Sequence, residues 1–163
     1  MADERRYAAL IGPGSCDEPT ATLARDVGAG LARAGFTLVT GGMLGAMEAA
    51  SQGAHEAGGT VVGLLPGTDR SGANRWCDIS IPTGLGHARN LAVVASADVV
   101  VAVGGEWGTL SEIGLAGALG RPVVLLAGWR LDHASALPGE VSYADSAEQA
   151  VSLAQRLVER SSS

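Results

Sequence analysis

Short apolar runs alternate with stretches of helical periodicity along most of this chain. The apolar runs are continuous and rich in Val, Leu and Ile, which is typical of parallel strands that are buried on both faces. They predict strands at residues 7–11, 36–40, 60–64, 78–81, 99–103, 122–126 and 141–143. The stretches between them predict helices at residues 20–34, 43–57, 86–96, 109–119 and 146–160. Thr20 is the residue that we expect to cap the first helix.

This alternation of strands and helices indicates an α/β fold. Helical crossovers between parallel strands are right-handed, so the helices cover both faces of a doubly wound, Rossmann-like parallel sheet. The chain has 163 residues and neither an internal repeat nor a linker, which predicts one nucleotide- or phosphate-binding domain over residues 1–163. Residues 161–163 are expected to form a frayed tail.

Glycine-rich segments follow the predicted strands, whereas the connections from helix to strand have the composition of ordinary helix-ending turns. In chain order, the segments after the strands are Gly12-Pro13-Gly14-Ser15, Gly41-Gly42-Met43-Leu44-Gly45, Leu65-Pro66-Gly67, Thr83-Gly84-Leu85-Gly86 and Gly104-Gly105-Glu106-Trp107-Gly108-Thr109. Loops that follow parallel strands all lie at the carboxyl edge of the sheet, where open α/β folds bind their ligands. The sequence therefore predicts a ligand crevice at this edge.

The last of these segments is the most informative. A strongly apolar strand runs into Gly104-Gly105, and a helix follows at once. Unpaired backbone N–H groups and the helix dipole favour a phosphate at such a turn. We expect Glu106 and Trp107 to line the crevice, where an exposed Trp can stack on a planar ring.

Glu112 has two interpretations that the spacing leaves equally open. In the first, Thr109 is the N-cap residue and Glu112 completes a capping box, a purely structural role. In the second, the Glu112 carboxylate faces the ligand beside the anion site.

Two further segments are candidates for binding an anion. Gly41-Gly42-x-x-Gly45 is similar to a phosphate-holding turn before a helix, although a tight turn with glycines at positive φ explains it as well. Arg89 comes early in a predicted helix, where the dipole disfavours a cation unless an anion pairs with it. The alternative for Arg89 is a surface salt bridge.

The composition limits the kinds of partner that this protein is expected to bind. Hydrophobic residues make up 47% of the chain and charged residues 17%, so we expect a homodimer or homotetramer to cover the apolar surface. The net charge of -6 argues against a nucleic-acid polymer or a membrane surface as partner. No apolar run reaches the roughly 18–20 residues of a membrane span, and the first residues lack the apolar core of a signal peptide. We therefore expect a cytoplasmic protein.

Several enzyme classes are excluded by absent residue types. All 11 basic residues are Arg, which excludes a Walker-type phosphate loop and any Schiff-base or pyridoxal-phosphate enzyme, since both need a Lys. Gly12-x-Gly14 lacks the third glycine of a dinucleotide fingerprint, and Thr40-Gly41 stands where such a site presents Asp or Glu. Cys16 and Cys77 are too few for a zinc framework, so we predict no metal site.

At this point the motifs resemble a known family. Gly104-Gly105-Glu106-Trp107-Gly108-Thr109-Leu110-Ser111-Glu112 is similar to the Gly-Gly-x-Gly-Thr-x-x-Glu signature of the LOG-like proteins, which were once mislabelled lysine decarboxylases. Gly41-Gly42-x-x-Gly45-x-Met47 and the Arg89 helix occur in the expected order, and the similarity covers residues 7–128. The segment from Thr83 to Asn90 most resembles the molybdenum-cofactor-carrier-like branch.

The resemblance implies a protein that binds a phosphorylated planar small molecule, either a nucleotide or the molybdenum cofactor as cargo, and that requires no cofactor of its own. The ligand-binding residues so assigned, together with those of the first loop, are Gly12, Gly14, Ser15, Gly41, Gly42, Gly45, Met47, Gly105, Glu106, Trp107, Gly108 and Thr109. The alternative is a nucleoside 5'-monophosphate phosphoribohydrolase, in which Glu112 and Arg89 would act at the glycosidic bond.

Three departures from the family pattern weaken the hydrolase more than the binding protein. The hydrolases generally have Pro before Gly-Gly and Lys after Arg, where this chain has Val103 and Asn90. The chain also has one extra residue between the glycines of the signature, which are separated by Glu106-Trp107.

Overall fold

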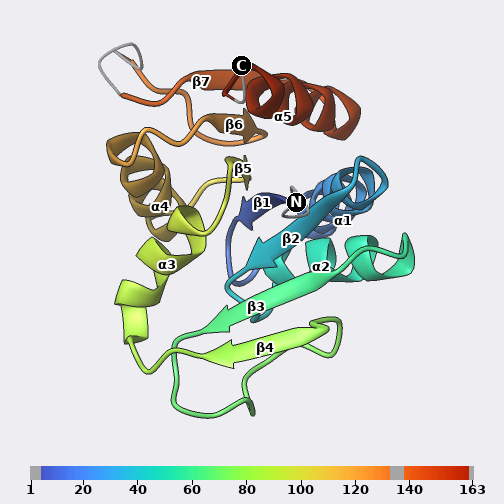
Figure 1. The fold of residues 1–163 in the computed structure, drawn as a ribbon, viewed down its shortest axis with the longest axis vertical. Helices are drawn as coiled ribbons and strands as arrows, with labels where there is room; N and C mark the ends of the chain where they lie inside the picture. Colours follow the sequence, from blue (N-terminus) through green and yellow to red (C-terminus); the bar gives the residue numbers. More distant parts are fainter. Residues whose placement is uncertain (1–4, 133–137, 162–163) are drawn as a thin grey trace.

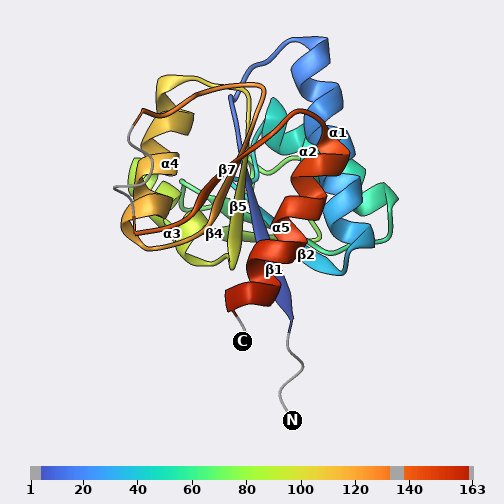
Figure 2. The same ribbon diagram turned by 90° about the horizontal axis from the view of Figure 1, so that it is seen from above.

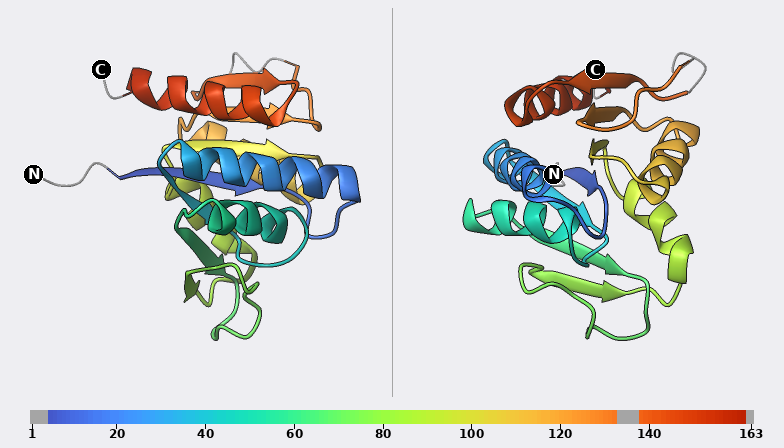
Figure 3. Two further views of the ribbon diagram at one scale, coloured as in Figure 1. Left: turned by 90° about the vertical axis from the view of Figure 1, so that its right-hand side faces the viewer. Right: turned by 180° about the vertical axis from the view of Figure 1, so that it is seen from behind.

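The computed structural model describes residues 5–132 and 138–161, which form an α/β domain around a seven-stranded parallel sheet (Figure 1). The strands lie in the order β4-β3-β2-β1-β5-β6-β7. Their bounds are Arg6–Ile11 (β1), Phe36–Thr40 (β2), Val61–Leu65 (β3), Ile79–Pro82 (β4), Val99–Val103 (β5), Val123–Leu126 (β6) and Val141–Ala144 (β7). The predicted doubly wound parallel sheet is confirmed, and all its arrows point to one edge (Figure 3).

Helices cover both faces of this sheet. Their bounds are Glu18–Arg33 (α1), Ala46–Glu56 (α2), Arg89–Ala95 (α3), Trp107–Ala118 (α4) and Ala147–Ser161 (α5), and a 3-10 turn at Gly86–Ala88 precedes α3. Helices α1, α2 and α5 lie on one face, and α3 and α4 lie on the other (Figure 2). Each layer has its own apolar core against the sheet.

Strand β5 shows why the apolar runs are continuous. Val99, Val101 and Val103 belong to the core beneath α1, α2 and α5. Val100 and Ala102 belong to the core beneath α3 and α4. Because both faces of the strand are covered, every residue of the strand is apolar. The alternation of apolar and polar residues that marks a half-exposed strand is therefore absent from the sequence.

The face of the sheet on which the connecting helix lies changes between the neighbouring strands β1 and β5. The chain leaves β1 and β2 for helices on one face, and it leaves β4 and β5 for helices on the other. Strands β1 and β5 are hydrogen-bonded neighbours. Their following loops therefore diverge at the carboxyl edge, which is where an open α/β sheet has its ligand crevice.

Several helix ends differ from the sequence-based expectation. The N-cap of α1 is Asp17 and not Thr20, because the Asp17 carboxylate accepts a hydrogen bond from the Thr20 amide at 3.0 Å. Helix α2 begins at Ala46 rather than at residue 43, since Gly42 and Gly45 have φ of 73° and 65° and keep the chain in a turn. Ser161, expected in the frayed tail, is the last residue of α5, and residues 162–163 lie outside the described part.

Glycine allows α1 and α2 to pack at short range. A Cβ built at Gly28 of α1 would overlap the carbonyl group of Ala50 in α2. A Cβ at Gly53 of α2 would overlap the carbonyl of Arg25 in the same way. Neither obstacle is a flexible side chain, so the contact requires glycine on both helices.

Gly28→Ala tests this packing against the usual preference of helices for alanine. We expect a loss of about 1–3 kcal/mol in the free energy of unfolding, because the new methyl group meets backbone atoms. Gly114→Ala on α4 is the matched control, since a Cβ there meets no atom within 4 Å. That substitution should raise stability by up to about 1 kcal/mol. Urea unfolding of both variants measures the difference, and equal effects would contradict the packing constraint.

A candidate ligand crevice at the carboxyl edge of the sheet

The loop after β1 packs against the start of α2. The Ala46 amide donates to the carbonyl oxygen of Pro13 at 3.0 Å. A side chain at Gly12 would overlap atoms of Ala46 and Val103. A side chain at Gly45 would overlap the backbone of Pro13 and Gly14. The structure thus brings together the predicted glycines of the first two turns. Gly42 and Gly45 do have the positive φ of a tight turn, which fits the structural explanation and leaves ligand binding open.

Arg89 reaches from the first residue of α3 to the carboxyl ends of β2 and β3. Its Nη1 donates to the carbonyl oxygens of Gly41 and Leu64, the second at 2.9 Å. The guanidinium and the Sδ of Met47 occupy the space where a side chain of Gly41 would lie. Among the described residues Arg89 has no ion-pair partner, so the alternative interpretation of Arg89 as part of a surface salt bridge is wrong. A cation is instead placed at the crevice by backbone carbonyls.

The capping-box interpretation of Glu112 is also wrong. Helix α4 begins at Trp107, and its N-cap is Glu106 in an extended conformation (φ -116°, ψ 173°). Thr109 is therefore the third helical residue and Glu112 the sixth, one turn too far along to reach the N-cap amide. Gly104, at φ 74°, turns the chain so sharply after β5 that the helix can begin two residues earlier than predicted.

Glu112 is instead a half-buried carboxyl group whose charge interacts with Arg89. Burial raises the pKa of Glu112 to about 7, and the nearby Arg89 guanidinium partly opposes this rise. Burial likewise lowers the pKa of Arg89, while Glu112 raises it. Within the described residues no ion pair joins the two, so they interact through the local field without a direct contact.

The first turn of α4 offers hydrogen-bond donors without partners inside the helix. The side chain of Glu106 makes no cap hydrogen bond, and the first intrahelical bond runs from the Leu110 amide to the Glu106 carbonyl at 3.0 Å. The amides of residues 107–109 precede it. Beside them a Cβ at Gly108 would meet no atom within 4 Å, so this glycine opens onto free space.

Two buried polar atoms at this edge have no hydrogen-bond partner within the described part of the chain. They are the Oγ1 of Thr109, a residue that is only 2% exposed, and the Nε of Arg89. An unpaired buried donor or acceptor costs roughly 1–3 kcal/mol, so such atoms indicate a missing partner.

Two residues of this region were not among the site residues predicted from the sequence. Asn74, which is 5% exposed, holds the turn after β2 by two hydrogen bonds. Its backbone N–H donates to the Gly42 carbonyl oxygen and its side-chain Nδ2 donates to the Met43 carbonyl oxygen, each at 2.8 Å. Its loop carries no periodic pattern, so nothing in the sequence distinguished this Asn. Trp129, which follows β6, donates from Nε1 to the Glu106 carbonyl at 3.2 Å.

The other described side chains near this edge provide neither a reactive thiolate nor a metal site. Ser15 and Gly14 are exposed at the end of the first loop. Burial raises the pKa of the Cys16 thiol, and the charges of Asp17, Glu18 and Glu106 add to the rise, so this thiol stays protonated near neutral pH. No three His, Cys, Asp or Glu side chains of the described ranges lie close enough together to hold a metal ion.

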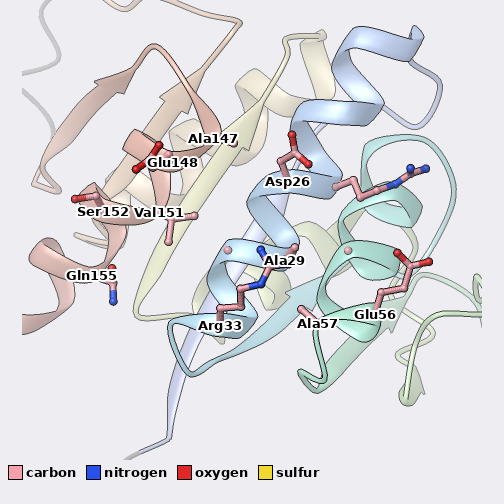
Figure 4. A pocket seen from close by; sticks show the side chains of 13 residues that line it. Asp26, Ala29, Arg33, Glu56, Ala57, Ala147, Glu148, Val151, Ser152 and Gln155 are labelled. Atoms are coloured by element: carbon pink, nitrogen blue, oxygen red, sulfur yellow. The ribbon is translucent and has the colours of Figure 1, made fainter.

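One hollow on the surface lies away from this edge. It encloses about 700 Å³ and runs between α1, α2 and α5, where Asp26, Arg33, Glu56 and Glu148 lie around small side chains (Figure 4). It contains none of the residues predicted to bind a ligand. The carboxyl edge is marked instead by its unpaired polar groups and by Gly108, which has open space beside it.

The fold is that of a Rossmann-like α/β protein. Comparison with known proteins shows the family to which the chain belongs. The chain belongs to the SLOG cluster4 family, whose model matches residues 5–157. An uncharacterized protein of Archaeoglobus fulgidus is 44% identical over 117 residues, which is 72% of this chain and 77% of that protein.

Two solved structures are similar over nearly the whole chain. One is the molybdenum cofactor binding protein of Rippkaea orientalis, with 38% identity and a TM-score of 0.88 over 95% of this chain and 98% of that one. The other is the molybdenum cofactor carrier protein of Chlamydomonas reinhardtii, with 35% identity and a TM-score of 0.85 over 96% of this chain and 99% of that one. These likenesses support the branch that the sequence motifs suggested.

None of the described helices is both long enough and apolar enough to cross a membrane.

Glu112→Gln tests the buried carboxyl group. The folded state raises its pKa from 4.5 to about 7, so folded protein binds this proton more tightly than unfolded protein does. The stability that the neutral carboxyl contributes is complete below its unfolded pKa and is lost as the pH rises through about 7. We expect Glu112→Gln to gain stability relative to wild type between pH 5 and pH 8, by roughly 2–8 °C in Tm. A Tm difference that stays constant across this range would contradict the burial.

Proposed function

We propose that this protein binds a phosphorylated planar small molecule, and specifically the molybdenum cofactor, in the crevice at the carboxyl edge and carries it as cargo. The observation that carries the proposal is the pair of buried, unpaired polar atoms of Arg89 and Thr109 at this edge. The family membership and the likeness to two proteins described as binding or carrying this cofactor support it.

The phosphate group of the cargo fits the first turn of α4. Amides 108 and 109 are free of intrahelical bonds, and the helix dipole adds a partial positive charge. The Thr109 hydroxyl, in the same turn, gains the partner that the protein does not supply. Gly108 leaves the approach open because it has no side chain.

Arg89 and Glu112 set the charge of the crevice. Arg89 is held by backbone carbonyls, so its position does not depend on the ligand. Below a pH of about 7 the Glu112 carboxyl is neutral and can donate a hydrogen bond to an anionic group. Above that pH the same group repels an anion, so binding of a phosphorylated ligand should weaken as the pH rises.

The homodimer or homotetramer expected from composition stays a prediction. The exposure of several large apolar side chains supports it, and these are Leu44, Ile79, Ile81, Leu85, Leu91, Trp107 and Leu119.

Gly108→Ala tests where the cargo binds. Molybdenum cofactor released anaerobically from a molybdoenzyme is offered to the protein, and bound molybdenum is measured by elemental analysis after gel filtration. We expect wild type and the control Gly114→Ala to retain cofactor, because residue 114 lies on the same helix but away from its first turn. Gly108→Ala should weaken binding roughly tenfold or more, which is about 1.4 kcal/mol. Its methyl group meets no protein atom, so strain does not explain a loss.

Each outcome of that experiment is decisive. Equal retention by the two alanine variants would overturn the assignment of the first turn of α4. Absence of molybdenum from wild type would overturn the function itself.

A nucleoside 5'-monophosphate phosphoribohydrolase is the second candidate. The observation that favours it is Glu112, since a carboxyl with a pKa of about 7 is suited to general acid–base catalysis at neutral pH. Purine and pyrimidine monophosphates are incubated with wild type and Glu112→Gln, and free base is measured by chromatography. Base release that the substitution abolishes, with the fold retained, would establish the hydrolase. Absence of base release from every nucleotide would exclude it.

A further inference from the structure

An exposed pair of tryptophans stands beside the first turn of α4. Trp107, the first residue of the helix, is 79% exposed. Its ring centroid lies 5.5 Å from that of Trp129, and the two ring planes are tilted by 49°. Because Trp is enriched at binding interfaces, an exposed pair of indoles is a candidate contact surface for a partner or ligand.

The pair is held in place by the turns on either side of it. Trp129 donates from Nε1 to the carbonyl oxygen of Glu106 at 3.2 Å. Its indole occupies the space in which a side chain of Gly105 would lie. Gly128 in turn packs against the carbonyl of Gly104, so the turns after β5 and β6 are in contact. The platform is therefore already formed, and a ligand need not pay the full entropy of ordering it.

The platform and the anion-binding turn are adjacent. Trp107 is the residue directly before Gly108, and one helical turn rises about 5.4 Å. A ligand whose phosphate lies on the amides of residues 108 and 109 thus has the open indole of Trp107 within reach of a ring that is linked to that phosphate.

We propose that Trp107, supported by Trp129, is the stacking platform for the planar heterocycle of the ligand, and that it selects phosphorylated fused heteroaromatic compounds over phosphate esters without a ring. This assignment rests on the proposed function, because it requires a phosphorylated ligand at the first turn of α4. The platform would recognise the ring of the ligand, which the glycine turns cannot do, because backbone amides bind a phosphate regardless of the group that carries it.

Isothermal titration with three probes separates the ring from the phosphate. The probes are GMP, guanosine and inorganic phosphate, because guanine shares its fused pyrimidinone ring with a pterin. Each is titrated into wild type, Trp107→Ala, Trp107→Phe, Gly108→Ala and the control Trp76→Phe. Trp76 is the remaining Trp of the chain, and its ring packs on His55 and Arg75 instead.

Wild type is expected to bind GMP more tightly than inorganic phosphate. Trp107→Ala should weaken GMP binding roughly fivefold or more, the usual range for loss of one stacked base, and should affect phosphate much less. Trp107→Phe should restore most of the GMP affinity, because it keeps an aromatic face. Gly108→Ala should weaken both GMP and phosphate, and Trp76→Phe neither. Trp107 is exposed, so its substitution should leave the thermal melting of the protein near that of wild type.

Other results would overturn the platform. A wild type that binds GMP no more tightly than phosphate, or a Trp107→Ala variant that keeps wild-type affinity for GMP, would do so while the carrier function could still stand on cofactor loading. Dissociation of an oligomer by Trp107→Ala, with unchanged GMP affinity, would identify the pair as a contact between copies of the chain. Failure of wild type to take up molybdenum cofactor or any probe would instead overturn the function on which the platform rests.

Discussion

The burial of β1 and β5 between two helical layers governs the rest of this structure. Both strands are covered on each face, and they are direct neighbours in the sheet. Their apolar side chains require helices on both faces of the sheet, and the chain leaves β1 for one of these layers and β5 for the other. The two connections therefore diverge at the carboxyl edge: the loop after β1 turns toward α1, and the turn after β5 leads into α4 on the other face.

Close approach of backbone at the carboxyl edge is the second constraint. Gly12, Gly41 and Gly45 each lie where a side chain would overlap atoms of a neighbouring loop or of Arg89. These glycines shape the crevice but do not face open space. Gly108 differs, since nothing in the protein requires it to be a glycine. The distinction separates glycines that the packing of this edge requires from one that it does not.

The electrostatics of the crevice follow from this packing. Arg89 satisfies two carbonyl oxygens and keeps its charge at the edge, while Glu112 is half-buried near it without a direct bond. Burial raises the pKa of Glu112 more than the charge of Arg89 lowers it, and the result is a pKa of about 7. A cargo phosphate would therefore meet one fixed cation and one group whose charge depends on pH.

The sequence by itself determined the parallel sheet, its helical layers and the edge at which the glycine-rich turns gather. Continuous apolar runs and one-sided glycine turns are local signals, because burial on both faces and positive φ act residue by residue. It also identified Arg89, Glu112 and Trp107 as notable, but it could not settle their roles. The start of α4 depends on how sharply Gly104 turns, which decided that Glu112 is no helix cap. Only the tertiary structure brought Arg89 to the carbonyls of β2 and β3, Asn74 to the turn after β2 and Trp129 to Trp107. Such contacts join residues far apart in the chain, and their geometry follows from the packing of whole layers, for which no single stretch of sequence carries a signal.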